Sequence, residues 1–265
     1  MAFSSLSRFV IQMFPYAIER LLVVETVPEI REVFLEGAAQ LGFDFALYAA
    51  QFMLSVPSSV LRDKPIVFTN FPLQLMAEAQ MLGRLDSDPW IQWVLDNDGE
   101  IAADDLQALP GVVSPSLQLA ARHGLGQCQI VSLRDKVLDS VGAVLVVPEQ
   151  GADAATLARR WRQSGRELRV LAWVMHMRIA TMNRALPVTT LTPRQREVLT
   201  WRSAGKTVGE VATILGITPA TVEKHTRLAR EALGVATTSQ AVLKAHVCRL
   251  LVPPDPSGPR GPGLS

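Results

Sequence analysis

Basic and hydroxyl side chains recur along residues 206–230 in an arrangement that suits contact with nucleic acid. Lys224 and Arg227 carry donors that can reach a guanine edge, and Glu223 can accept from cytosine. Other residues of the group suit phosphates, which fix register without reading sequence. Any one basic residue could equally lie on a solvated helix face, but the group as a unit favours DNA. The predicted DNA-binding residues are Lys206, Thr207, Thr218, Thr221, Glu223, Lys224, Arg227 and Arg230.

Three short helices must position these side chains, and the sequence marks their ends. A hydroxyl residue followed three positions later by Gln or Glu forms a capping box, which satisfies two backbone N–H groups. Glycine takes the left-handed conformation that ends a helix. The starts fall at Thr192, Thr207 and Thr218, and the stops at Gly205 and Gly216. Two helices joined by the tight turn 216–218 predict a helix-turn-helix.

This segment resembles the LuxR family of transcription regulators, whose pattern is similar to LTxRExxVLxxxAxGKxxxEIAxxLxISxxTVxxHxxxxxxKL. Gln195 replaces a family Glu, which keeps the cap but removes a negative charge. Helical spacing predicts that Val222, Leu233 and one of Leu228 and Ala229 face inward. His225 is expected to have a structural role. The matches in register are Leu191, Thr192, Val198, Leu199, Gly205, Lys206, Glu210, Ala212, Leu215, Thr221, Val222, His225 and Leu233.

A fourth helix is predicted over residues 239–251, and it is apolar on more than one side. Val242, Ala245 and Arg249 mark one face, while another carries Leu243, Val247 and Leu250. A helix this short can bury only one face in a small bundle, so the other favours a second copy. A homodimer on a two-fold operator is therefore expected. A heterodimer with a related regulator is the alternative.

Charge is unevenly distributed along the 265 residues, although the net charge is only +1. Residues 192–250 contain nine Lys or Arg and four Glu, or +5, whereas residues 1–191 carry 16 basic and 20 acidic groups, or −4. Such a basic module on an acidic body suits attraction to phosphate at one end only. Cys128 and Cys248 lack metal-ligand spacing and are expected to be reduced and packed. Charges interrupt the apolar N-terminus, so a cytoplasmic protein without a membrane span is expected.

The N-terminal region mixes helices and strands. Helices are predicted over 5–25, 28–41, 72–85, 114–123 and 153–183, and strands over 43–52, 65–69, 128–133 and 140–147, the last two as a hairpin. The segment 86–105 is acidic and carries two tryptophans. This order indicates an α+β fold. The predicted domains are 1–184 (sensor and dimerisation), 185–190 (linker), 191–252 (helix-turn-helix) and 253–265 (disordered tail).

The N-terminal region also resembles, more weakly, the autoinducer-binding domain of LuxR proteins. Asn70-Phe71-Pro72 and Asp88-Pro89 match the family's Asn-Tyr-Pro and Asp-Pro at the right distance. The resemblance implies an α/β/α sandwich with an antiparallel sheet and a pocket for acyl-homoserine lactones. The family's pocket Trp and Tyr fall on Leu75 and Ala79, so ordinary lactones are not the expected ligand. The candidate pocket residues are Leu75, Ala79, Asp88, Trp90, Trp93 and Cys128.

Each pocket candidate also has a structural interpretation. Asp88 before Pro89 is a typical N-cap, and Trp90 and Trp93 lie on one helical face, as core residues do. No nucleophile–base order, phosphate loop or zinc spacing is recognisable, so no enzyme, cofactor or metal is expected. The sequence predicts a DNA-binding regulator of quorum-sensing type. The alternative is an anti-activator that pairs with another regulator.

Overall fold

The chain folds into two compact units, the first comprising residues 1–55 and 63–182 and the second residues 56–62 and 183–265. The computed structural model describes residues 14–52, 54, 56, 57, 60, 65–83, 87–134, 136–182, 191–248, 250 and 251. The predicted linker 185–190 and tail 253–265 lie outside these residues. Each unit is described separately below.

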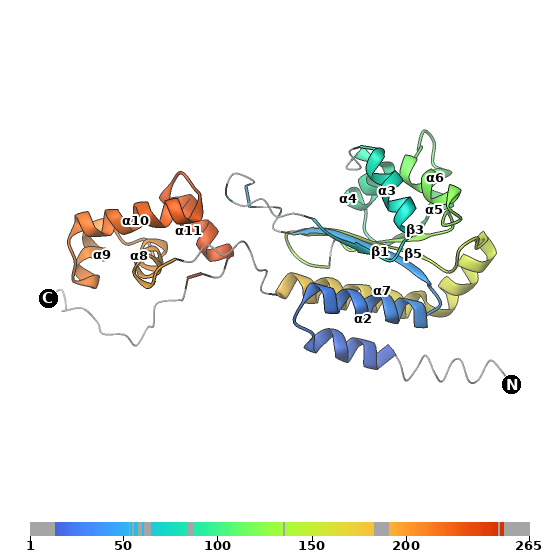
Figure 1. Cartoon of the computed structure of the whole chain (residues 1–265), viewed down its shortest axis with the longest axis horizontal. Helices are drawn as coiled ribbons and strands as arrows, with labels where there is room; N and C mark the ends of the chain where they lie inside the picture. Colours follow the sequence, from blue (N-terminus) through green and yellow to red (C-terminus); the bar gives the residue numbers. More distant parts are fainter. Residues whose placement is uncertain are drawn as a thin grey trace. The chain divides into compact units, whose positions relative to one another are not determined.

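A five-stranded antiparallel sheet forms the middle layer of the N-terminal unit (Figure 1), with strand order β2-β1-β5-β4-β3. Tyr48 in β1 lies opposite Phe68 of β2 and Val144 of β5. Burial alternates along β1, whereas the central strand β5 is buried almost throughout because both its faces are covered. The strands are β1 Phe45–Phe52, β2 Ile66–Thr69, β3 Glu100–Ala102, β4 Gln129–Ser132 and β5 Ser140–Val147. The predicted β4–β5 hairpin is confirmed.

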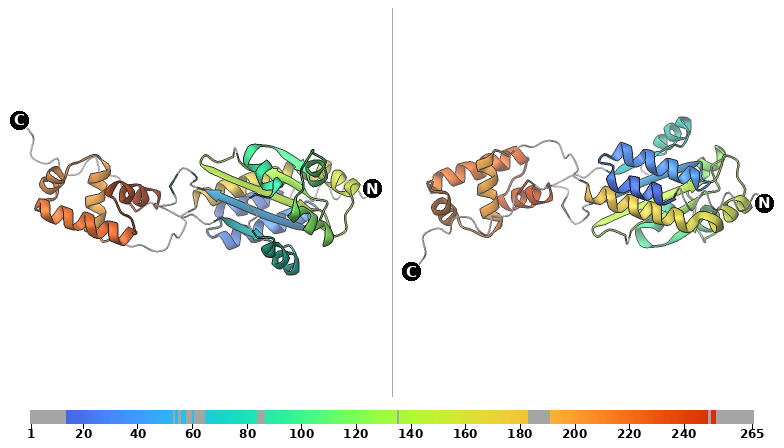
Figure 2. Two further views of the ribbon diagram at one scale, coloured as in Figure 1. Left: turned by 90° about the horizontal axis from the view of Figure 1, so that it is seen from above. Right: turned by 90° about the horizontal axis from the view of Figure 1, so that it is seen from below.

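One face of the sheet is covered by α2 Val27–Gln40 and α7 Ala154–Thr181, and the helical residues 14–23 pack on the outer side of these two helices (Figure 1 and Figure 2). Asp153 caps α7 as predicted, its carboxylate accepting from the Thr156 N–H at 2.7 Å. The apolar stripe of α7 includes Leu168, Leu171 and Met175, all fully buried against α2 and the sheet. Helix, sheet and helix thus make the predicted α/β/α sandwich.

Four short helices cover the opposite face of the sheet (Figure 1). They are α3 Leu73–Met81, α4 Pro89–Asp96, α5 Ala103–Gln107 and α6 Pro115–Arg122. β3 and the start of α5 lie in the acidic segment 86–105, in which the sequence indicated only a helix after the Asp88 cap. β3 has only three residues and pairs with β4 at the edge of the sheet. Three residues are too few to show the alternating hydrophobic pattern of a strand in the sequence. β3 is therefore recognisable only from its pairing with β4.

The described residues of the C-terminal unit form four helices, α8 Pro193–Ser203, α9 Val208–Leu215, α10 Pro219–Leu233 and α11 Thr238–Val247. Both predicted capping boxes are present; in the first, the Thr192 N–H donates to the Gln195 side chain at 2.8 Å. Gly205 and Gly216 have φ of +80° and +64°, as the helix stops require. The turn between α9 and α10 therefore has the geometry of a helix-turn-helix.

The last helix differs from its prediction. α11 ends at Val247 rather than at residue 251, because the chain turns there and the Leu250 N–H bonds the Ala245 carbonyl at 2.8 Å. Its buried positions are Ala241 and Ala245, against which Val242 and Leu250 are only partly buried. Leu243 is 38% exposed. Arg249 lies outside the described residues. Small side chains thus form the contact face, and one large apolar residue remains on the surface.

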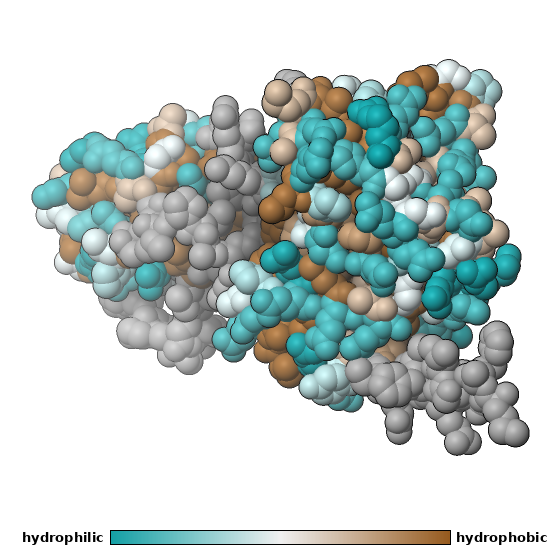
Figure 3. All heavy atoms as spheres, turned by 45° about the vertical axis from the view of Figure 1, so that its right-hand side comes forward, coloured by the Kyte–Doolittle hydropathy of each residue, from teal (hydrophilic) through white to brown (hydrophobic). Residues whose placement is uncertain are grey.

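The visible face of the molecule is largely hydrophilic, with smaller hydrophobic areas between (Figure 3). Exposed apolar side chains nevertheless occur, among them Leu73 and Met81 at the two ends of α3. Among the described residues, none of the helices combines the length and apolar character that a membrane crossing needs.

Candidate functional site

Two hydroxyl residues begin the recognition helix α10. The Thr218 hydroxyl accepts from the Thr221 N–H at 3.2 Å, and the two hydroxyl oxygens lie 2.8 Å apart. Pro219 occupies the first helical turn, where its missing N–H costs nothing. Thr218 is exposed and Thr221 half-buried. The start of α10 therefore presents hydroxyl groups at the positive end of the helix dipole, a combination that suits phosphate.

One face of α10 is buried and the opposite face is an exposed stripe. Val222, Ala229 and Leu233 point inward. Of the two inward candidates left open, Ala229 is buried and Leu228 only half-buried, because the narrow bundle admits the smaller side chain. The exposed stripe runs along one side of the helix and is formed by Ala220, Glu223, Lys224, Arg227 and Glu231.

The two predicted guanine readers are in different electrostatic settings. Arg227 Nη1 lies 2.6 Å from Glu231 Oε1 in an ion pair whose side chains are 55% and 57% exposed. Lys224 is exposed and makes no ion pair or side-chain hydrogen bond with any residue that the structure describes. Lys224 can therefore meet DNA without a partner in the described part of the protein, whereas Arg227 meets it already bonded to Glu231.

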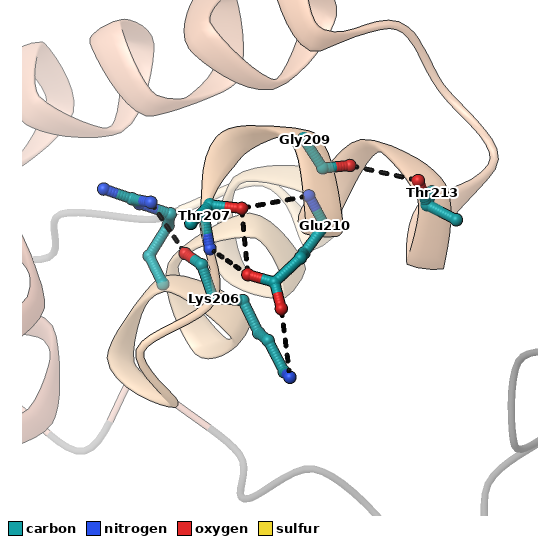
Figure 4. A network of polar contacts seen from close by, with 6 residues as sticks. Lys206, Thr207, Gly209, Glu210 and Thr213 are labelled. Carbon is teal, nitrogen blue, oxygen red and sulfur yellow. Dashed lines mark hydrogen bonds and ion pairs between the residues drawn. The ribbon is translucent and has the colours of Figure 1, made fainter. Parts of the chain in front are cut away.

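Lys206 and Thr207 belong to a polar network at the start of α9 (Figure 4). The Thr207 N–H and hydroxyl donate to Glu210 at 2.8 and 2.9 Å, and Lys206 Nζ lies 3.4 Å from the same carboxylate. The Thr207 backbone bond, followed by its hydroxyl, lowers the pKa of Glu210 below its ordinary value. Arg202 donates to the Lys206 carbonyl at 2.6 Å. These contacts fix the turn between α8 and α9 and leave Lys206 at its surface.

Arg230 supports the chain after α10. Its Nη1 donates to the Ala236 carbonyl at 2.9 Å, and its Nε is buried without a partner among the described residues. His225 is half-buried, in agreement with a structural role. The predicted DNA contact of Arg230 stays a prediction, and it depends on the donors that the Ala236 bond leaves free.

The six predicted pocket residues come together on the sheet face that α3–α6 cover. We call this the α3–α6 cluster; Leu75, Trp90 and Cys128 are buried in it beside Leu117, Ile130 and Leu145, and Ala79 and Trp93 pack against it half-buried. Burial, aided by nearby Asp104, raises the pKa of the Cys128 thiol to about 12. The thiol is thus neutral at physiological pH and behaves as a small apolar group.

Asp88 joins two helix starts at the border of this cluster. One carboxylate oxygen accepts from the Ser114 hydroxyl at 2.5 Å and the Trp90 N–H at 3.4 Å, and the other accepts from the Ser116 N–H at 3.1 Å. Trp90 Nε1 donates to the Ser116 hydroxyl at 2.9 Å. Asp88 is only 4% exposed. It is thus the N-cap of α4, the structural interpretation that the sequence offered, and it also holds the start of α6.

Sequence reasoning missed the partners in this network and in a second one. Ser114 was predicted to open α6, but nothing local indicated its bond to Asp88, 26 residues away. On the other sheet face, buried His176 lies between the Tyr48 hydroxyl at 2.9 Å and the Ser140 hydroxyl at 3.1 Å. Only the tertiary fold brings these groups together. Within the described part of the chain, no three His, Cys, Asp or Glu side chains gather as they would around a metal.

Two family models match the chain, one to each unit. The one described as "Autoinducer binding domain" matches residues 26–179, and "Bacterial regulatory proteins, luxR family" matches residues 189–245. The transcriptional activator protein AnoR of Acinetobacter nosocomialis is 26% identical over 239 residues, covering 87% of this chain and 95% of AnoR. BjaR1 of Bradyrhizobium diazoefficiens is 42% identical over 67 residues, which are 25% of this chain and 28% of BjaR1.

Solved structures agree with the fold. SdiA in complex with octanoyl-rac-glycerol superposes with a TM-score of 0.60 at 22% identity, covering 90% of this chain and 95% of SdiA. Escherichia coli SdiA in another crystal form gives 0.59 at 21% identity, covering 91% and 99%. The matching family comprises regulators of transcription and not enzymes. This chain belongs to the LuxR family of bacterial transcription regulators, with an autoinducer-binding domain ahead of its DNA-binding helix-turn-helix.

Proposed function

We propose that this LuxR-family regulator acts in the cytoplasm as a homodimer on promoter DNA and that ordinary acyl-homoserine lactones do not switch it. One observation carries the second part of the proposal. By its sequence resemblance to the family, the chain has Leu75 and Ala79 of α3 where the family pocket has a Trp and a Tyr, and both residues pack in the α3–α6 cluster. Neither side chain can donate a hydrogen bond.

The missing donors have a large expected effect. An unpaired ligand carbonyl costs about 1–3 kcal/mol for each lost donor. Two such losses weaken lactone binding by roughly 10²–10⁴-fold. The domain would then need lactone concentrations far above those that a tight site requires.

The polar groups of Asp88 and Trp90 already have partners in the protein. Both oxygens of Asp88 accept bonds from the starts of α4 and α6, and Trp90 Nε1 donates to Ser116. A lactone amide would have to share or displace these short bonds. A ligand that enters here therefore gains mainly from apolar contact, or the domain folds without one.

The SdiA complex with octanoyl-rac-glycerol supports the apolar alternative, since that protein of similar fold holds an acyl group without a lactone ring. A thermal shift assay on the full chain separates the cases, because a tight ligand must raise the melting temperature. We expect no shift with micromolar lactones of several acyl lengths. A rise of several degrees with one lactone would overturn the proposal. Octanoyl glycerol in a parallel series distinguishes an acyl-binding domain from one that needs no ligand.

A restored-pocket variant provides the matched control. Leu75→Trp with Ala79→Tyr returns the family's two side chains to α3, and its lactone response is compared with that of the native chain. If the donors are what the native pocket lacks, the double variant gains a lactone-dependent rise in melting temperature. An equal absence of response in a folded double variant would show that another feature of the cluster excludes the lactone.

Lys224 and Arg227 are proposed as the principal DNA contacts because both lie on the exposed stripe of α10. Alanine at either position should weaken promoter binding in a gel shift, by about 1–3 kcal/mol if it reads a base. Lys244→Ala is the matched control, since Lys244 bonds the Leu233 carbonyl and removing it deletes one charge away from the stripe. Unchanged binding by the Lys224→Ala/Arg227→Ala double variant would contradict the assignment.

The same gel shift tests the alternative of an anti-activator. A regulator that reads DNA itself binds the promoter alone, with a steep dependence on salt. A heterodimerising anti-activator would leave free DNA unshifted and only weaken the shift that a related regulator produces.

A further inference from the structure

Glu231 is an acidic residue on a helix face that otherwise suits DNA. It lies at the C-terminal end of the exposed stripe of α10, one turn after Arg227, and its carboxylate is 2.6 Å from the Arg227 guanidinium. A negative charge in the last turn of a helix opposes the helix dipole. Placing the acid after the base is also the less favourable order for an i,i+4 pair. Helix stability therefore gives little reason for Glu231.

Glu231 restrains Arg227 but leaves it hydrogen-bond donors for another partner. The guanidinium uses Nη1 on Glu231, whereas a guanidinium offers five N–H donors. Both side chains are more than half exposed, so the pair is weak enough to open. Lys224, on the same stripe, has no such restraint among the described residues. The helix thus combines one unrestrained cation with one restrained cation.

We infer that Glu231 is a specificity-determining residue that acts through Arg227, by competing with DNA phosphates for its guanidinium. A duplex that offers only phosphates must displace Glu231 in return for one charge contact. A base edge in the operator can instead bind the N–H donors that Arg227 keeps free, so that its bond to Glu231 is retained. Glu231 therefore suppresses binding to unrelated DNA more than binding to the operator. The inference rests on Arg227 facing DNA, as proposed above.

Glu231→Gln removes the charge and keeps the size of the side chain. In the full chain we expect its affinity for an unrelated duplex to rise about two- to fivefold, the range set by an exposed ion pair. The salt dependence of this binding should steepen by about one additional phosphate contact. On a duplex selected in vitro for tight binding to the native chain, the gain should be smaller, so the ratio of specific to non-specific affinity falls.

Glu197→Gln is the matched control. Glu197 pairs with Arg194 at the same 2.6 Å, and both residues lie on α8 rather than on the stripe of α10. Arg194 also donates to the Leu215 carbonyl at 2.8 Å. Glu197→Gln changes the net charge by the same amount as Glu231→Gln. An equal gain in DNA affinity in the two variants would show that overall charge causes the effect, and this would overturn the inference.

A double-mutant cycle separates restraint from direct repulsion. If Glu231 acts through Arg227, Glu231→Gln gives no gain in the Arg227→Ala background. A gain of the same size there would show that Glu231 repels phosphate directly, and the inference would be wrong. Arg227→Ala alone tests whether Arg227 contacts DNA at all. If Arg227→Ala weakens binding but Glu231→Gln gives no gain in the otherwise native chain, only the restraint is refuted. If Arg227→Ala does not weaken binding, the DNA contact itself is refuted.

Discussion

Replacing Asp88 with alanine should destabilise the N-terminal unit far more than the loss of an ordinary helix cap. The carboxylate is 4% exposed and accepts bonds from the Ser114 hydroxyl and from the N–H groups of Trp90 and Ser116. Loss of an N-cap costs about 0.5–2 kcal/mol. Each further bond to a charged acceptor contributes about 1.5–3 kcal/mol. Because these terms overlap, the expected loss is about 3–5 kcal/mol.

Asp153→Ala provides the comparison. Asp153 caps α7 through the Thr156 N–H and lies exposed, so its loss should destabilise the protein far less. Unfolding of the full chain in urea, followed by tryptophan fluorescence, reports mainly on the N-terminal unit, which contains four of the five tryptophans. A similar destabilisation in the two variants would refute the structural role of Asp88. If Asp88→Ala were as stable as the native chain but lost a thermal shift that the native chain shows with octanoyl glycerol, the ligand role would be supported instead.

Four further predictions each concern a single residue. Cys128, with a pKa of about 12, should resist thiol reagents in the native protein at about pH 8 while half-buried Cys248 reacts, and both should react after denaturation, as a colorimetric thiol titration would show. Gly142→Ala should lose about 1–3 kcal/mol in chemical denaturation, because its Cβ would lie 2.9 Å from that of Ala50. Gly209→Ala, whose Cβ meets nothing within 4 Å in α9, should gain about 0.5–1 kcal/mol in the same measurement. Hydrogen bonds lower the pKa of Glu210 in the folded state, so its contribution to stability is complete above the ordinary pKa of 4.5 and is lost as the pH falls through the lower folded value. In Glu210→Gln, the melting temperature should therefore fall less steeply with decreasing pH in this acidic range.

The DNA-binding unit could be predicted well because its signals are local. The Thr207–Glu210 capping box and the left-handed Gly216 depend on residues within one helical turn. Spacing alone also left open whether Leu228 or Ala229 packs inward, since the answer depends on the room between helices. α11 was misjudged for the same reason: the bundle accepts alanines at its closest contact and leaves Leu243 outside.

In the N-terminal unit, the elements could be predicted better than their contacts. The hairpin of β4 and β5 was recognisable from apolar runs, but β3 exists only through pairing with β4. The polar networks join distant residues, as Tyr48 and His176 do across 128 positions. A residue's own neighbours in sequence cannot predict such a partner. The sequence named the candidate pocket residues, and the fold brings them together as a group. The hydrogen bonds that Asp88 accepts could be seen only in the structure.

The two units differ in where their polar side chains find partners, and this difference predicts how each responds to mutation. Asp88 is satisfied inside the N-terminal unit, so changing it alters the fold before it alters any ligand response. Arg230 is comparable in the C-terminal unit, because its bond to the Ala236 carbonyl supports a turn. Lys224 has its charge exposed and no partner among the described residues, so its replacement should change DNA binding while stability stays nearly constant. Measuring both quantities for the three variants therefore separates residues that hold the regulator together from those that meet its DNA.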